Sequence, residues 1–491
     1  IILDSLRADA LGVLGNPVCQ TPNLDALAAA GTAFGQCFAQ NPACAPSRAS
    51  ILTGWYPHVR GHRTFTYHIQ PDEENLLKYF KRAGFHVKAV GTNDCLHEDS
   101  FPDSLDAWIE CNRPCMDGMK GPLAEDPVQR AAFLSGRLTE TQGRDRNWEI
   151  KERAVDFVRN AGPEPWFLYA AFHIPHPKYG VPDPWYSMYD PADMPEPIAC
   201  SLEDKAPYLQ AWHEATHMDQ RDAHTVKQIR AIYYGMVSLA DHYVGELLEA
   251  LKASGAFDNT TVVFLADHGD FTGDYGLVEK GQCCTQDCLI NIPLILKPPA
   301  SLHAAAGQKP DVLCEAIDVL PTLLEIHGIP LAHNQYGRSL VPLLRGETET
   351  HKDAVFTQGG FNPEDWFALT GYRRRESPLL QDPTFVYAPK LRLQAEHPEW
   401  FDRYTCLRTS EWKYVQRGTG PEELYDLQND PQETVNVAAE PEHVAVKARL
   451  KDQLLAFYLR TSDAVSHTID DRLCAAAWDP ERGLRRGTVK A

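Results

Sequence analysis

One segment of the sequence places a thiol directly before residues that begin a helix. Cys44 is followed by Pro46, Ser47 and Arg48, and the Pro-Ser pair predicts the start of a helix that continues to Leu52. Free backbone N–H groups at a helix start attract an anion, and the guanidinium of Arg48 adds a fixed positive charge one turn later. The segment therefore predicts a nucleophile beside an anion site; a buried cysteine in an ordinary turn is the alternative that these residues leave open.

Polar side chains follow four short apolar runs that are rich in strand-forming residues. The runs cover residues 1–3, 86–90, 166–172 and 261–266, and the groups that follow them are Asp4-Ser5, Gly91-Thr92-Asn93-Asp94, His173-Ile174-Pro175-His176 and Asp267-His268-Gly269. Ligands of parallel sheets bind beyond the carboxyl ends of the strands. We therefore expect these four groups to meet in a single site.

Amphipathic helical stretches separate the predicted strands. They begin at Thr21-Pro22 and cover about 148–160, 227–253 and 315–327. Strands that alternate with helices predict an α/β fold, in which helices sandwich a large, mostly parallel sheet.

The periodic pattern changes near residue 347, which we interpret as a domain boundary. Residues 1–346 are predicted to form the catalytic domain, and 347–491 a smaller C-terminal α+β domain. The second domain is expected to contain a hairpin of 404–409 with 412–416 and a helix over about 441–459. Its tail from Asp463 is expected to be loop-like and suited to covering a neighbouring subunit of a homo-oligomer.

Composition excludes several classes of protein. The chain has 47 Lys and Arg against 67 Asp and Glu, a formal net charge of −20, which argues against nucleic acid as a partner. No apolar run approaches the roughly 20 residues of a membrane helix, so no membrane association is expected. An odd count of 13 cysteines favours reduced thiols and a cytoplasmic location. A periplasmic or secreted location stays open, because the sequence starts inside the apolar run at Ile1.

The segment around Cys44 resembles the signature of type I sulfatases, within the alkaline phosphatase-like superfamily. In that family the cysteine is oxidised to formylglycine, whose hydrate is the nucleophile, so the resemblance implies a formylglycine-generating enzyme as a transient partner. The resemblance extends over nearly the whole chain. The matching residues are Asp4, Thr21-Pro22-Asn23-Leu24-Asp25, Cys44-x-Pro46-Ser47-Arg48, Leu52-Thr53-Gly54, Pro175-His176-Pro177, Asp267-His268-Gly269, Gly337-x-Ser339-Leu340, Lys413-Tyr414, Glu423-Leu424-Tyr425-Asp426-Leu427 and Asn429-Asp430-Pro431.

The resemblance also implies a metal site. Asp4, Asp267, His268 and the modified Cys44 match the family's ligands to a divalent cation, and Ser5 stands where the common pattern has a second Asp. Carboxylate ligands suit Ca²⁺, which is expected first, while an imidazole ligand also suits Mn²⁺.

The remaining candidate site residues would contact the substrate. Lys280, His176 and Arg48 match catalytic positions of the family. At Thr92, Asn93 and Asp94, predicted to line the substrate pocket, the chain departs from the pattern, because many sulfatases have a lysine after the glycine and then a histidine. The anion is therefore expected to lose one positive partner.

Two other motifs contain residue types that bind metal ions, but their sequence context does not support a metal site. His213 and His217 frame an H-E-x-x-H pattern, but its surroundings are polar and no further His follows. Cys283, Cys284 and Cys288 lack a second pair of ligands nearby and are interpreted as incidental thiols.

The sequence therefore predicts a sulfatase that hydrolyses a sulfate monoester, with a sulfated carbohydrate preferred over an aryl or alkyl sulfate. A phosphonate monoester or phosphodiester hydrolase of the same superfamily is the first alternative. A non-catalytic relative with unmodified Cys44 is the second.

Overall fold

The architecture is built on an eight-stranded sheet with the strand order β10-β2-β9-β8-β1-β6-β3-β4. The computed structural model describes residues 1–111, 131–203, 205–362, 378–382 and 385–463, and the backbone of 478–479 and 483–484. The strands are β1 (Ile2–Asp4), β2 (Thr32–Phe38), β3 (His86–Gly91), β4 (Ala107–Ile109), β6 (Trp166–Pro175), β8 (Val262–Ala266), β9 (Asn291–Lys297) and β10 (Cys314–Glu315).

The four strands predicted from the sequence are neighbours in this sheet, in the order β8-β1-β6-β3. They pair in parallel, so their carboxyl ends lie at one edge. Strand β9, which runs antiparallel to both of its neighbours, was not predicted. The expected mostly parallel α/β sheet is confirmed.

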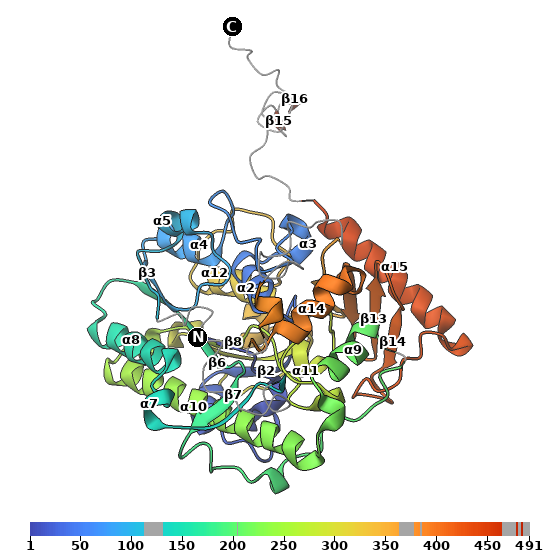
Figure 1. The fold of residues 1–491 in the computed structure, drawn as a ribbon. Helices are drawn as coiled ribbons and strands as arrows, with labels where there is room; N and C mark the ends of the chain where they lie inside the picture. The colour runs from blue at the N-terminus through green and yellow to red at the C-terminus, as the bar shows by residue number, and fades with distance from the viewer. Residues whose placement is uncertain are drawn as a thin grey trace.

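Helices cover both faces of the sheet (Figure 1). Two consecutive residues of β6 show the two layers: Trp166 packs edge-on against Phe157 of α8 (Arg146–Asn160), whereas Phe167 packs against Phe80 of α4 (Leu76–Arg82). The same faces carry the long α10 (Ala223–Ala253), which lies against α8, and α2 (Cys44–Thr53), which lies against α4. Side chains therefore alternate between two buried layers, as in a sheet enclosed by helices.

A second, antiparallel sheet has the order β11-β12-β13-β14. Its strands are β11 (Val355–Gly359), β12 (Tyr404–Arg408), β13 (Trp412–Arg417) and β14 (Glu423–Asp426), and α15 (Val444–Thr461) follows them. The predicted hairpin is confirmed as β12 and β13. Hydrogen bonds tie β11 to the larger sheet, because Thr357 Oγ1 donates to the Ala39 carbonyl at 2.6 Å and the Gln358 amide to the Gln40 carbonyl at 2.8 Å.

Two predicted helix starts are wrong. Helix α2 begins at Cys44, before the predicted start at Pro46 and Ser47, because a proline at the third position needs no intrahelical partner for its nitrogen. The stretch predicted to be helical from residue 315 starts with Glu315, the last residue of β10, whose buried carboxylate accepts hydrogen bonds from the Tyr56 hydroxyl and the Phe356 amide. Helix α12 (Val319–Ile326) starts only after a 3₁₀ turn. Across the described residues, none of the helices has the length and apolar character needed to span a bilayer.

Candidate active site

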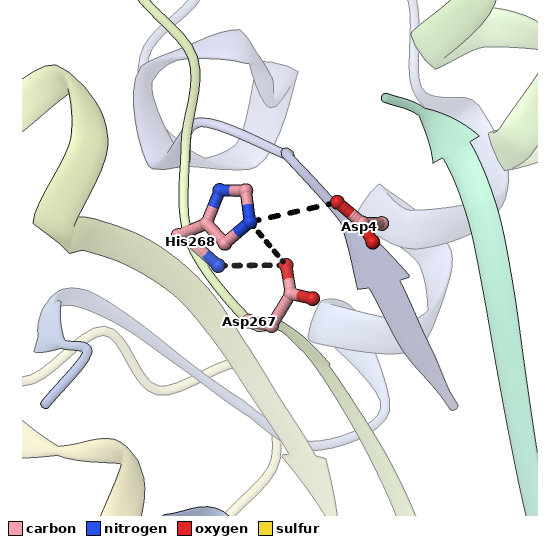
Figure 2. A group of neighbouring side chains, drawn as sticks. All are labelled: Asp4, Asp267 and His268. Atoms are coloured by element: carbon pink, nitrogen blue, oxygen red, sulfur yellow. Dashed lines mark hydrogen bonds and ion pairs between the residues drawn. The ribbon is translucent and has the colours of Figure 1, made fainter. Parts of the chain in front are cut away.

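Three predicted metal ligands converge where β1 and β8 end. Asp4 is the last residue of β1, and Asp267 and His268 directly follow the adjacent β8. His268 Nε2 lies 3.5 Å from Asp4 Oδ1 and 3.6 Å from Asp267 Oδ1, and all three side chains are buried. Figure 2 shows the imidazole directed toward both carboxylates.

The donor set fits a divalent cation. His268 Nδ1 lies 2.8 Å from the Gly269 carbonyl and so carries the ring proton, which leaves a lone pair on Nε2. That nitrogen is buried and has no hydrogen-bond partner. Burial, reinforced by the charge of Lys280, lowers the pKa of His268 to about 3, so the ring stays neutral, as a metal ligand must. An orphaned nitrogen beside two carboxylate oxygens is the arrangement that a cation would complete.

The two carboxylates repel one another in a buried space. The pKa of Asp267 is raised to about 7, first by burial and then by the negative charge of Asp4. Burial also opposes ionisation of Asp4, but the positive charges of Lys280 and Arg48 keep its pKa well below the ordinary value. A bound cation would favour the ionised form of both groups.

Arg48 fixes the orientation of these carboxylates. Its Nε lies 2.8 Å from Asp267 Oδ2, and its two terminal nitrogens lie 3.0 Å from Asp4 Oδ2 and 3.0 Å from Asp94 Oδ2. The guanidinium is fully buried, yet the three acids keep its pKa raised. Because Arg48 occupies the Oδ2 atoms, Asp4 and Asp267 turn their Oδ1 atoms toward His268.

Cys44 is the first residue of α2 and lies beside the same carboxylates. Its sulfur is within 4.8 Å of oxygens of both Asp4 and Asp94. The hydroxyl of Ser47 donates to the Asp267 carbonyl at 2.6 Å and so ties the helix start to the end of β8. Burial, against the opposing charge of Lys280, raises the pKa of the thiol well above its ordinary value, and a protonated thiol is a poor nucleophile.

Lys280 and His176 are the remaining predicted catalytic groups at this site. Lys280 Nζ lies 3.9 Å from Asp4 Oδ1, and the negative charges of Asp4 and Glu279 overcome burial and raise its pKa. Burial and the charge of Lys280 lower the pKa of His176 well below its ordinary value. Its ring stacks on His173, with centroids 4.4 Å apart, and His173 Nδ1 lies 3.7 Å from Asp4 Oδ2.

A cavity of about 1450 Å³ opens over these residues. Part of its wall comes from α8 and the segment before it, and part from the C-terminal half of the chain, including α14 (Ala388–Glu396). The described residues that line it and were predicted as site residues are Asp4, Cys44, Thr92, Asp94, His176 and Lys280.

Three predicted site residues, Ser5, Thr92 and Asn93, use their side chains to bond other residues of the protein. Asn93 is absent from the described lining of the cavity, and its side chain bonds its own turn at the Leu96 amide and carbonyl. The Ser5 hydroxyl donates a hydrogen bond to Asp4 Oδ1 at 3.0 Å, so Ser5 lies beside the predicted metal ligands as a hydrogen-bond partner of Asp4. Thr92 is at the cavity, but its Oγ1 accepts a hydrogen bond from Arg146 at 3.1 Å.

Sequence reasoning missed several charged residues of this cavity, among them Arg146, Glu279 and Lys390. Arg146 is the first residue of α8, directly after Asp145, whose side chain caps the helix; a capping signal was therefore present in the sequence. Glu279 precedes Lys280, and Lys390 reaches both residues from α14. No sequence pattern links Lys390 to a residue more than 100 positions away.

The two alternative metal motifs do not form sites within the described structure. Helix α9 (Pro207–Ala215) ends before His217, whose backbone is left-handed with φ of 55°, so His213 and His217 do not share a helical face. Among the described residues, neither these histidines nor Cys283, Cys284 and Cys288 belong to a group with metal-ligand geometry.

A sheet of this type, with a buried cysteine and a group of two carboxylates and an imidazole at the carboxyl ends of its strands, has the side chains that a metal-dependent hydrolase of anionic esters needs. Residues 1–329 match the family model described as Sulfatase, and the chain belongs to this family. It is a sulfuric ester hydrolase by family.

Similar proteins carry related names. An arylsulfatase of Clostridium perfringens is 28% identical over 402 residues, covering 74% of this chain and 81% of the relative. The multifunctional alkaline phosphatase superfamily protein PehA of Trinickia caryophylli is 26% identical, covering 94% and 95%. The crystal structure of a phosphonate monoester hydrolase of Agrobacterium radiobacter has a TM-score of 0.74 at 24% identity and covers 99% of both chains, which shows the fold.

Proposed function

We propose that the protein hydrolyses a sulfate monoester by means of a formylglycine made from Cys44 and a divalent cation, Ca²⁺ first and Mn²⁺ second. The observation that carries this proposal is that Asp4, which lines the cavity together with Cys44, also belongs to the buried group of Asp4, Asp267 and His268. A formylglycine-generating enzyme would act on Cys44 as a transient partner.

The chain's own residues would divide the work. The formylglycine hydrate would supply the attacking oxygen, and the cation would supply Lewis-acid stabilisation. Arg48 holds Asp4 and Asp267 in position to bind the cation, as its hydrogen bonds to both indicate. Lys280, kept as an ammonium, would neutralise charge on the sulfate and leaving oxygens and would protonate the departing alcohol, while the neutral ring of His176 would lie beside the leaving oxygen.

The size of the cavity supports a sulfated carbohydrate over a small aryl or alkyl sulfate. Typical small-molecule pockets have volumes of roughly 300–1,000 Å³, and this cavity is larger. The space beyond the anion therefore accommodates an alcohol of sugar size.

A second candidate is a phosphonate monoester or phosphodiester hydrolase. The observation that favours it is Thr92, which stands at the tip of β3 where many sulfatases have a lysine. Arg146 of α8 brings a positive charge to Thr92, so a guanidinium lies in the cavity where the sequence pattern lacks the lysine. We assign Arg146 to the anion, which would restore the missing partner and support the sulfatase assignment over this alternative.

Turnover of matched esters tests the assignment. Protein with verified formylglycine content would be assayed with aryl sulfate, aryl phosphodiester and aryl phosphonate, and with a panel of sulfated sugars. We expect the highest kcat/KM for a sulfated sugar. A higher kcat/KM for the phosphodiester or phosphonate would establish the second candidate. A chain with only unmodified Cys44 and no turnover would indicate a non-catalytic relative.

A further inference from the structure

The acidic neighbour of Lys280 has no role in the proposed mechanism, yet it is one of the most constrained residues of the cavity. Glu279 is almost fully buried and lines the cavity together with Cys44. Its backbone is left-handed, with φ of 62°, which is unfavourable for a residue other than glycine. Such a conformation persists where surrounding contacts determine it, and it occurs preferentially at functional sites.

Several contacts hold the backbone of Glu279 in this conformation. Its amide donates to the Tyr179 hydroxyl at 2.9 Å, and its carbonyl accepts from the Phe271 amide at 3.1 Å. The conformation turns the side chain into the cavity between two candidate catalytic groups.

The two carboxylate oxygens of Glu279 have different surroundings. Oε2 accepts a hydrogen bond from Lys390 Nζ at 2.6 Å, and the same ammonium donates to the Lys280 carbonyl. Oε1 is buried without a hydrogen-bond partner, and it lies 3.6 Å from Lys280 Nζ and 3.9 Å from His176 Nε2. One oxygen is therefore anchored from α14, and the other faces the Lys280 ammonium and the imidazole of His176.

We propose that Glu279, anchored by Lys390, is a positioning residue that orients Lys280 and His176 toward the leaving oxygen. The inference rests on the proposed function, because it concerns the groups assigned to the leaving alcohol. It also gives the C-terminal part of the chain a role in the reaction, since α14 supplies the anchor. The carboxylate itself is not assigned to the substrate, because an anionic ester and an anionic side chain repel one another.

Glu279→Gln tests the proposal, and the chain offers a matched control. Glu433 is also buried, has φ of 54°, pairs with the buried Lys413 and leaves Oε2 unpartnered, but it does not line the described cavity. Glu433→Gln thus reproduces the cost of neutralising a buried Glu–Lys pair without changing the site. Metal and formylglycine content would be measured in each protein.

The first measurement is kcat and KM for aryl sulfates that range from a good leaving group, nitrophenol, to a poor one, phenol. In Glu279→Gln we expect kcat for phenyl sulfate to fall about tenfold to a hundredfold and kcat for nitrophenyl sulfate to fall much less, with KM little changed, because only the poor leaving group needs an aligned proton donor. Glu433→Gln should leave the dependence on the leaving group unchanged. An equal loss for all esters, or no loss, would overturn the proposal.

The second measurement does not depend on activity. In a crystal structure of Glu279→Gln we expect Lys280 Nζ to move from its place beside Asp4 by about 1 Å or more, a displacement that is large for catalysis. If both Lys280 and His176 keep their positions, the proposal is wrong. If Glu279→Gln does not fold, Lys390→Gln removes the anchor from the other side and carries the same two expectations. A wild-type protein that hydrolyses none of the esters would refute the proposed function, while the structures would still decide the positioning role.

Discussion

Replacing His268 by alanine should remove a metal ligand while leaving the surrounding ion pairs in place. His268 Nε2 makes no hydrogen bond to the protein, and Nδ1 makes one, to the Gly269 carbonyl at 2.8 Å. Arg48 would still hold Asp4 and Asp267 by their Oδ2 atoms. The substitution should therefore affect the cation more than the fold.

The expected magnitude follows from linkage between binding and stability. Loss of even an outer partner of a metal ligand typically weakens binding by about 10–100-fold, so loss of the ligand itself should weaken it by about 100-fold or more. A cation present at about 100 times its Kd stabilises the folded protein by about 2.7 kcal/mol. His268→Ala should remove most of this increment. The lost hydrogen bond, worth about 1 kcal/mol, and the cavity left by the ring lower stability with or without metal.

The assay is the free energy of unfolding in Ca²⁺, in Mn²⁺ and in chelator, for both the parent protein and the variant. The effect of metal is the difference between the metal and chelator measurements, in which the cost of the cavity cancels. We expect a large difference in the parent and a small one in His268→Ala, together with lower metal content by elemental analysis and lower activity. An unchanged difference and unchanged metal content would refute the assignment of His268 as a ligand.

Four further predictions concern the same site. In active protein the peptide that contains Cys44 should carry an aldehyde or its hydrate, and a mass spectrum with only the thiol would contradict the nucleophile assignment. Asp267→Asn should lower metal content and activity by at least about tenfold, because it removes a charged ligand and sets an amide donor against Arg48 or a backbone amide; full activity with normal metal content would exclude Asp267 as a ligand. Thr92→Lys should raise kcat/KM for an aryl phosphate monoester relative to an aryl sulfate, since an added ammonium favours a dianion by about 1 kcal/mol or more. Arg146→Met should lower kcat/KM for the sulfate. An unchanged ratio in Thr92→Lys and unchanged kinetics in Arg146→Met would mean that neither residue is near the anion.

The sequence by itself determined which segments carry the chemistry. A run of apolar residues that ends in Asp4, or in Asp267 and His268, predicts a strand with ligands at its carboxyl end, and parallel strands bring such ends to one edge. The motif around Cys44 predicts the nucleophile position because its residue types are local to one helix start. The expectation that these segments meet needed only neighbouring residues and the alternation of strands with helices, whereas the predicted roles as metal ligands and nucleophile also needed the resemblance to sulfatases.

Only the tertiary structure decided how the groups face one another. That Arg48 binds the Oδ2 atoms and leaves the Oδ1 atoms toward His268 depends on the angle at which α2 meets the ends of β1 and β8. The approach of Arg146 to Thr92, and of Lys390 to Glu279, joins residues that are 54 and 111 positions apart. Periodicity specifies which face of an element is buried, but the direction of one side chain toward another is set by the packing of whole elements, which no local pattern contains.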